Sequence, residues 1–236
     1  MSTRVRHLVW IPAGALAGFG ASYIFGDLLT LPVDLYYLIY FTVVLGFLAL
    51  YVKATRLDVR SWSARRLRWA IVAGVAGGLV LMRAVLARPP TPGLSGAALG
   101  WALLWRGVAY GSVDGLLLLA FPWIVVWRAF EADRRPRPGR LGVAAIAWLA
   151  VLAVTTAYHA GYADFRSRKI VEPNVGSAIG ALPTILTASP VASPISHVFL
   201  HVTAVLHCPA TTTFLPPHRE PPGPGAEPAG VRAPER

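Results

Sequence analysis

The sequence holds little charge and a single cysteine. Only 14% of its 236 residues are charged, against roughly 25% in soluble domains. Cys208 is the only cysteine, which excludes an intrachain disulfide and any metal site of the CxxC type. The apolar stretches also lack the polar residues at helical period that a soluble helix turns toward water. These absences argue against a soluble protein.

Long apolar stretches fill most of the chain instead. Hydrophobic residues make up 55% of it, in runs near the roughly 20 residues that cross about 30 Å of hydrocarbon. We predict an all-α, polytopic transmembrane helical bundle over residues 1–208. The predicted spans are six, at about 8–26, 35–52, 69–88, 97–127, 141–159 and 192–208. The first span has the flanks of a signal peptide, but further apolar segments follow at once, which favours an uncleaved helix.

Basic residues gather in alternate connections between these spans. The N-terminal tail and the connections 53–68 and 128–140 are rich in arginine and lysine, and the intervening connections are poorer. The positive-inside rule then predicts a multi-pass cell-membrane protein with both termini in the cytoplasm. This distribution accounts for the net charge of +11 without nucleic acid. The lipid bilayer is the expected partner, with a homo-oligomer or a membrane partner subunit as the protein assembly.

Two segments depart from the pattern. Residues 170–196 are apolar but interrupted by four prolines, and proline removes a backbone donor and breaks helices. This segment is either an outer surface loop or a broken, partly re-entrant helix, and a full crossing would move the C-terminus to the other side. Residues 209–236 are rich in proline and glycine without periodicity, which predicts a disordered tail.

The stretch WRGVAYGSVDG, residues 105–115, places two charges inside the fourth span. On a helical wheel, Asp114 shares one half of the helix with three glycines, which indicates that this half faces protein. The glycines expected at close helix contacts are Gly107, Gly111 and Gly115, with Gly14, Gly18, Gly74 and Gly78 on other spans. A charge in the bilayer costs several kcal/mol and is usually paired or functional. We interpret Arg106 as an anchor at the outer headgroups and Asp114 as the lining of a polar cavity.

Three histidines are candidate partners for Asp114. His159 lies at the outer end of the fifth span, and His197 and His201 are four residues apart on one face of the sixth. Two histidines at this spacing with a third histidine or a carboxylate from another helix form a plausible metal set. We therefore assign Asp114 and His159 as candidate catalytic residues. The candidate metal ligands are His159, His197 and His201, for a divalent ion such as zinc. The sequence HVFLH lacks the glutamate of the HExxH motif.

Two membrane protease families show parts of this arrangement. The order of Arg106, His159 and His197–His201 resembles that in CAAX-type intramembrane proteases, although the glutamate pair that precedes the arginine there is missing. The resemblance covers residues 105–201 and implies a membrane hydrolase. Rhomboid proteases are similar in six spans, a serine on the fourth and a histidine on the sixth. Here Ser112 does not stand in a GxSG motif, and it falls on the other half of the wheel from Asp114.

Three functions remain open from the sequence. The first is a metal-dependent membrane hydrolase, similar to a protease, with its site in the outer half of the bundle. The second is a non-enzymatic transport, ion-conducting, proton-conducting or accessory subunit in which the same residues form a polar path. The third is a structural subunit whose histidines only pack. An intramembrane carboxylate favours one of the first two, because it is costly unless it serves a function.

Overall fold

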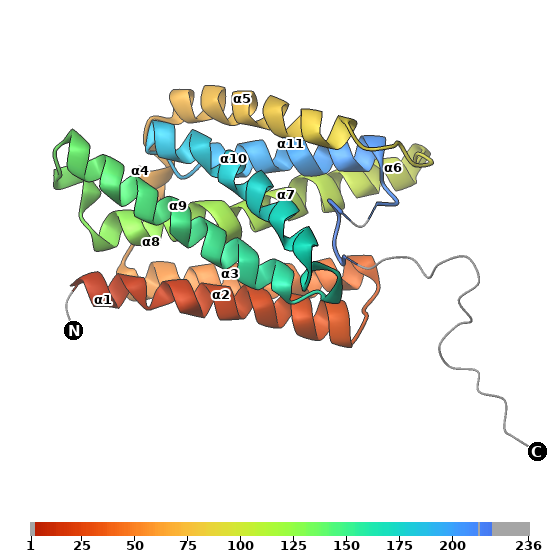
Figure 1. Ribbon diagram of the computed structural model, residues 1–236, viewed down its shortest axis with the longest axis horizontal. Coiled ribbons are helices and arrows are strands. Elements are labelled where there is room, and N and C mark those ends of the chain that lie inside the picture. The colour runs from red at the N-terminus through yellow and green to blue at the C-terminus, as the bar shows by residue number, and fades with distance from the viewer. Residues whose placement is uncertain (1–2, 212, 219–236) are drawn as a thin grey trace, which may run out of the picture.

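A computed structural model describes residues 3–211 and 213–218 of the chain, and its secondary structure is helical throughout (Figure 1). The α-helices are α1 (Thr3–Leu8), α2 (Trp10–Gly20), α3 (Val33–Thr55), α4 (Val59–Ala64), α5 (Leu67–Leu86), α6 (Gly96–Ala102), α7 (Tyr110–Gly115), α8 (Phe121–Ala129), α9 (Arg137–Ala160), α10 (Val171–Thr187) and α11 (Ala192–His207). Wider π-helical turns extend α2 as η1 (Ala21–Leu28) and join α6 to α8 as η2 (Leu103–Ala109) and η3 (Leu116–Ala120). The predicted all-α class is confirmed.

Five helical segments among the described residues are long and apolar enough to cross a membrane. They are Arg4–Leu28, Val33–Thr55, Leu67–Leu86, Gly96–Ala129 and Arg137–Ala160, and they match the first five predicted spans. Gly96–Ala129 has 34 residues, and its most apolar window is 72% buried, more than any other span. The fourth span is therefore the centre of the bundle, with the other helices around it.

The proline-interrupted segment forms a helix. α10 contains Pro183 within its length, and the proline ring lies against Gly77 of α5, where an added Cβ would be 2.6 Å from Pro183 Cγ. Helices in membranes tolerate proline when neighbouring helices supply the packing and polar partners. Thr184 and Ser193 provide such partners, because each side chain accepts a hydrogen bond from the backbone N–H of the other, at 3.0 and 3.4 Å. Of the two alternatives for this segment, the surface loop is excluded.

Because α10 runs along the bundle, α11 runs in the direction opposite to that of the six-span scheme. We call the end of the bundle that holds connections 56–66 and 130–136 the basic end, and the opposite one the far end. α1 begins at the basic end, α10 runs back toward it, and α11 ends at the far end (Figure 1). The start of α1 and the end of α11 therefore lie at opposite ends, which differs from the six-span scheme with both termini on one side. The six-span scheme did not count residues 170–196 as a crossing, whereas the alternative in which they cross fully places the two ends on opposite sides, as here.

The described residues after α11 fold back along the bundle. Leu215 is buried with Val85 and Ala102, and His218 is also buried. Residues 213–218 thus cover part of the far end, although the sequence places them at the start of the tail. Residues 219–236 lie outside the described part of the chain, so disorder there stays a prediction.

Candidate metal centre

Glycines bring the fourth span and α11 into backbone contact. A Cβ added at Gly111 would lie 2.9 Å from the Cα of Val198, and one at Gly115 would lie 2.9 Å from the Cα of Pro194. Gly107, one turn before Gly111 on the fourth span, meets Val202 of α11. The predicted close contact is confirmed, and the neighbour is the helix that carries His197 and His201. Small residues at this spacing are what allow membrane helices to approach so closely.

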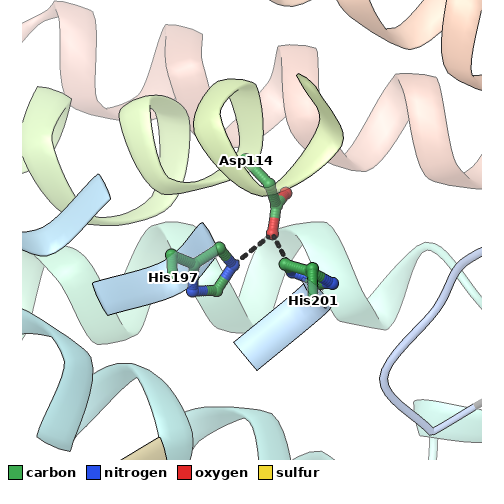
Figure 2. A group of neighbouring side chains, drawn as sticks. All are labelled: Asp114, His197 and His201. Carbon is green, nitrogen blue, oxygen red and sulfur yellow. Dashed lines mark hydrogen bonds and ion pairs between the residues drawn. The ribbon is translucent and has the colours of Figure 1, made fainter. Parts of the chain in front are cut away.

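The close contact places two imidazoles on one carboxylate. His197 Nε2 lies 2.8 Å from Asp114 Oδ2, and His201 Nε2 lies 3.9 Å from the same oxygen. Both rings point at this oxygen from consecutive turns of α11, with Asp114 facing them from α7 (Figure 2). Asp114 is 2% exposed, His197 8% and His201 4%. The structure therefore joins the buried carboxylate of Asp114 to a pair of buried histidines.

Tyr40 of α3 holds the second oxygen of the carboxylate. Its hydroxyl donates a hydrogen bond of 2.6 Å to Asp114 Oδ1, and the Tyr40 side chain is fully buried. With Oδ1 held in this way, Oδ2 is turned toward the histidines. A hydrogen bond from outside the ligand set that orients a ligand is a recurring feature of metal sites.

The three side chains are close enough together that they could hold a metal ion. One ligand atom each from Asp114, His197 and His201 lies within 4.8 Å of the others. Around a tetrahedral zinc ion with bonds of about 2.0–2.1 Å, ligand atoms are roughly 3.3 Å apart, a value between the observed 2.8 and 3.9 Å. Neither ring nitrogen of His201 makes a hydrogen bond of ordinary geometry within the described residues. The polar partners of this buried imidazole are the Asp114 carboxylate at 3.9 Å and the Phe214 backbone, and a bound cation would add a ligand bond to one ring nitrogen.

A cavity of about 360 Å³ extends from this group toward the far end. His159 lines it together with Asp114, His197 and His201, so the four residues selected from the sequence meet at one cavity. His159 is not, however, one of the three whose ligand atoms cluster. Its Nδ1–H donates to the Thr155 carbonyl at 2.9 Å, which leaves Nε2 as the nitrogen with a free lone pair. The geometry separates His159 from the candidate metal ligands.

His218 is a cavity residue that the sequence did not reveal. It is 4% exposed and lines the cavity beside His159, with the two ring centroids 5.5 Å apart. Its ring also packs edge-on against Tyr162 and Phe165. The proline-rich context of His218 predicted disorder, and no local pattern connects it with α9.

A cluster of buried tyrosine hydroxyls adjoins the group of Asp114, His197 and His201. Tyr158 is within hydrogen-bonding distance of Tyr110, Tyr162 and Tyr36 at 2.8, 2.9 and 3.2 Å, and Tyr36 also bonds to Tyr162. Four hydroxyls share four hydrogen bonds, so every donor in the cluster can be used. The ring of Tyr40 packs against three of these tyrosines. The cluster therefore continues the polar interior from Asp114 toward α9.

The other residues of the opening stretch have structural partners. Arg106 pairs with Asp34 at the start of α3 through two nitrogens, each 3.1 Å from the carboxylate. This placement at the far end agrees with its interpretation as an anchor. Tyr110, which lies between Arg106 and Asp114 in the sequence, bonds to Tyr158 and packs edge-on against His201. The chain has no match among known protein-family models, curated proteins or solved structures.

Proposed function

We propose that the protein is a metal-dependent membrane hydrolase whose divalent ion, such as zinc, is held by Asp114, His197 and His201. The observation that carries this proposal is the convergence of three buried ligand atoms within 4.8 Å at the edge of a cavity. Catalytic zinc sites typically use three protein ligands and keep the fourth position for water or substrate. The adjoining cavity provides space for that fourth position.

His159 is proposed as the proton carrier of the reaction. Its Nε2 is free to accept a proton because Nδ1–H is committed to Thr155. In hydrolysis, the oxygen of water bonds to the carbonyl carbon of the substrate while His159 takes a proton from that water. The bond from this carbon to the leaving group then breaks, and His159 returns the proton to the leaving group. A bound metal lowers the pKa of water and polarises the carbonyl.

Metal analysis of the purified protein tests the proposal. Wild type is expected to bind one equivalent of zinc, and His201→Ala is expected to lose it. His207→Ala is the matched control, because His207 lies on the same helix but bonds to the carbonyl of Arg88 instead of entering the cavity. His159→Ala should keep the metal and lose hydrolysis. A protein that binds no zinc, or a His201→Ala variant that binds as wild type does, contradicts the proposal.

A proton-conducting or ion-conducting subunit is the second candidate. The tyrosine cluster favours it, because chains of hydroxyls next to an intramembrane carboxylate can pass protons. This function predicts proton flux in reconstituted vesicles that Asp114→Asn abolishes. A protein that binds zinc and shows no flux above protein-free vesicles would support the hydrolase instead.

The orientation belongs to the same proposal. The basic end is placed at the cytoplasmic face of a cell membrane, because connections 53–68 and 128–140 carry most of the loop arginines. The cavity then lies in the outer half of the bilayer. Cysteine labelling with a membrane-impermeant maleimide tests this, with Ser63→Cys expected to stay unlabelled in intact cells and Gly93→Cys to react.

A further inference from the structure

The walls of the cavity away from the metal centre are apolar and belong to α5 and α10. Val80 and Ala84 form a stripe at helical spacing on α5, and Val171, Val175 and Ile179 form one on α10. Val80, Val171 and Val175 are 53%, 58% and 53% exposed. On a helix that crosses a membrane, exposed valines of this kind face lipid. The cavity is thus bounded by two lipid-facing helices, with its polar end deep inside the bundle.

The side of the cavity that faces water at the far end is covered. Arg88, just beyond α5, pairs with Glu172 of α10 at 2.8 Å, and both line the cavity. Thr213, Phe214 and His218 line it from the segment that folds back after α11. An ion pair and a chain segment therefore lie between the cavity and the aqueous phase. Apart from Val171, which directly precedes Glu172, the residues of the apolar stripes lie on the membrane side of that ion pair.

From this arrangement we propose that the cavity binds an amphipathic molecule with a single apolar chain, which enters from the bilayer between α5 and α10. Its polar group reaches Asp114, His197 and His201, and its chain lies along the valine stripes. The inference rests on the proposed metal-dependent function and names the class of substrate that the site takes. It differs from entry of a small polar substrate from water, for which apolar walls would contribute nothing.

Two hydroxamates of different chain length test this inference on the full-length, cobalt-loaded protein in detergent. Hydroxamates bind metal ions, and the cobalt absorption spectrum reports the binding. After correction for partition into detergent, decanohydroxamate is expected to bind on the order of a hundredfold more tightly than acetohydroxamate. This factor corresponds to about 2.8 kcal/mol, the burial of roughly three to four of the additional methylenes at about 0.8 kcal/mol each.

Substitutions that fill the space between α5 and α10 test lateral entry separately from metal binding. Val175→Trp, or Val80→Trp from the facing helix, should weaken decanohydroxamate at least tenfold and leave cobalt and acetohydroxamate binding unchanged. Leu149→Trp is the matched control, since Leu149 is 60% exposed on α9 and does not line the cavity. Cobalt binding with no chain-length preference, or equal weakening of both hydroxamates, overturns lateral entry alone. A protein that binds no cobalt overturns the proposed function, and lateral entry with it.

Discussion

Replacing Gly111 with alanine presses one methyl group against the backbone of α11. The new Cβ would lie 2.9 Å from the Cα of Val198, 3.3 Å from His201 Cδ2 and 3.4 Å from the His197 carbonyl oxygen. Ordinary contact begins at 3.4 Å, so the two helices must separate by about 0.5 Å, the difference between 3.4 and 2.9 Å. The nearest obstacle is backbone, which cannot turn aside as the end of a side chain can.

This separation acts on stability and on the site to different extents. Overpacking of this size costs typically ~1–3 kcal/mol, and alanine recovers roughly 0.5–1 kcal/mol relative to glycine within a helix. The net loss of stability is therefore about 0–2.5 kcal/mol. The site is more sensitive, because a metal centre must hold its ligands within about 0.5 Å. We expect Gly111→Ala to lower zinc affinity by at least about tenfold, in the range found when ligand support is lost.

Competition with a chromogenic zinc chelator measures the affinity, and thermal unfolding in detergent measures the stability. Gly46→Ala is the control, because Gly46 lies within α3 and its added Cβ meets no atom within 4 Å. That variant should bind zinc as wild type does and unfold at the same temperature or higher. If Gly111→Ala also keeps wild-type zinc affinity, the glycine contact does not position Asp114 against the histidines, and the reasoning from helix separation to metal binding is refuted.

Two further predictions concern single hydrogen bonds, one at Asp114 inside the bundle and one at the basic end. Tyr40→Phe removes the donor to Asp114 Oδ1 and should lower zinc affinity by about 10–100-fold; unchanged affinity in the chelator assay would show that this bond does not orient the carboxylate. At the basic end, the Arg65 hydrogen bond holds the pKa of Asp133 below its usual range. The stabilisation is complete above about pH 4 and is lost as the pH falls through the lowered pKa. The unfolding temperatures of wild type and Asp133→Asn should therefore differ at neutral pH and converge in acid, and a constant difference contradicts this.

Local patterns in the sequence were sufficient for the spans and for the helix contact. Hydropathy located the first five spans because burial in lipid demands long apolar runs. The spacing of Gly107, Gly111 and Gly115 located the tight contact because close helix approach excludes a Cβ. His197 and His201 could be paired because spacing by four puts two side chains on one helix face. Each of these features depends on residues near one another in the chain.

Features made by distant segments could not be found in this way. The hydroxyls of Tyr36, Tyr110 and Tyr158 come from three separate helices, and each tyrosine by itself looks like one more aromatic residue of an apolar span. In the sequence, Pro183 by itself predicts a broken helix. The packing of Pro183 against Gly77 depends on the three-dimensional arrangement, so no local pattern shows it. His218 is placed by the fold of the chain after α11. These residues have no shared sequence period, so only the structure connects them.

The last two helices are shorter than the hydrocarbon core of a typical bilayer is thick. α10 has 17 residues and α11 has 16, so each is about 24–26 Å long at 1.5 Å per residue. The hydrocarbon core of a typical bilayer is about 30 Å thick. If α10 and α11 cross the bilayer, this shortfall makes the lipids beside them compress or tilt, at a cost of fractions of a kcal/mol per Å. Headgroups and water would then stand closer to the valine stripes than along the other helices, which shortens the distance over which a polar headgroup must descend.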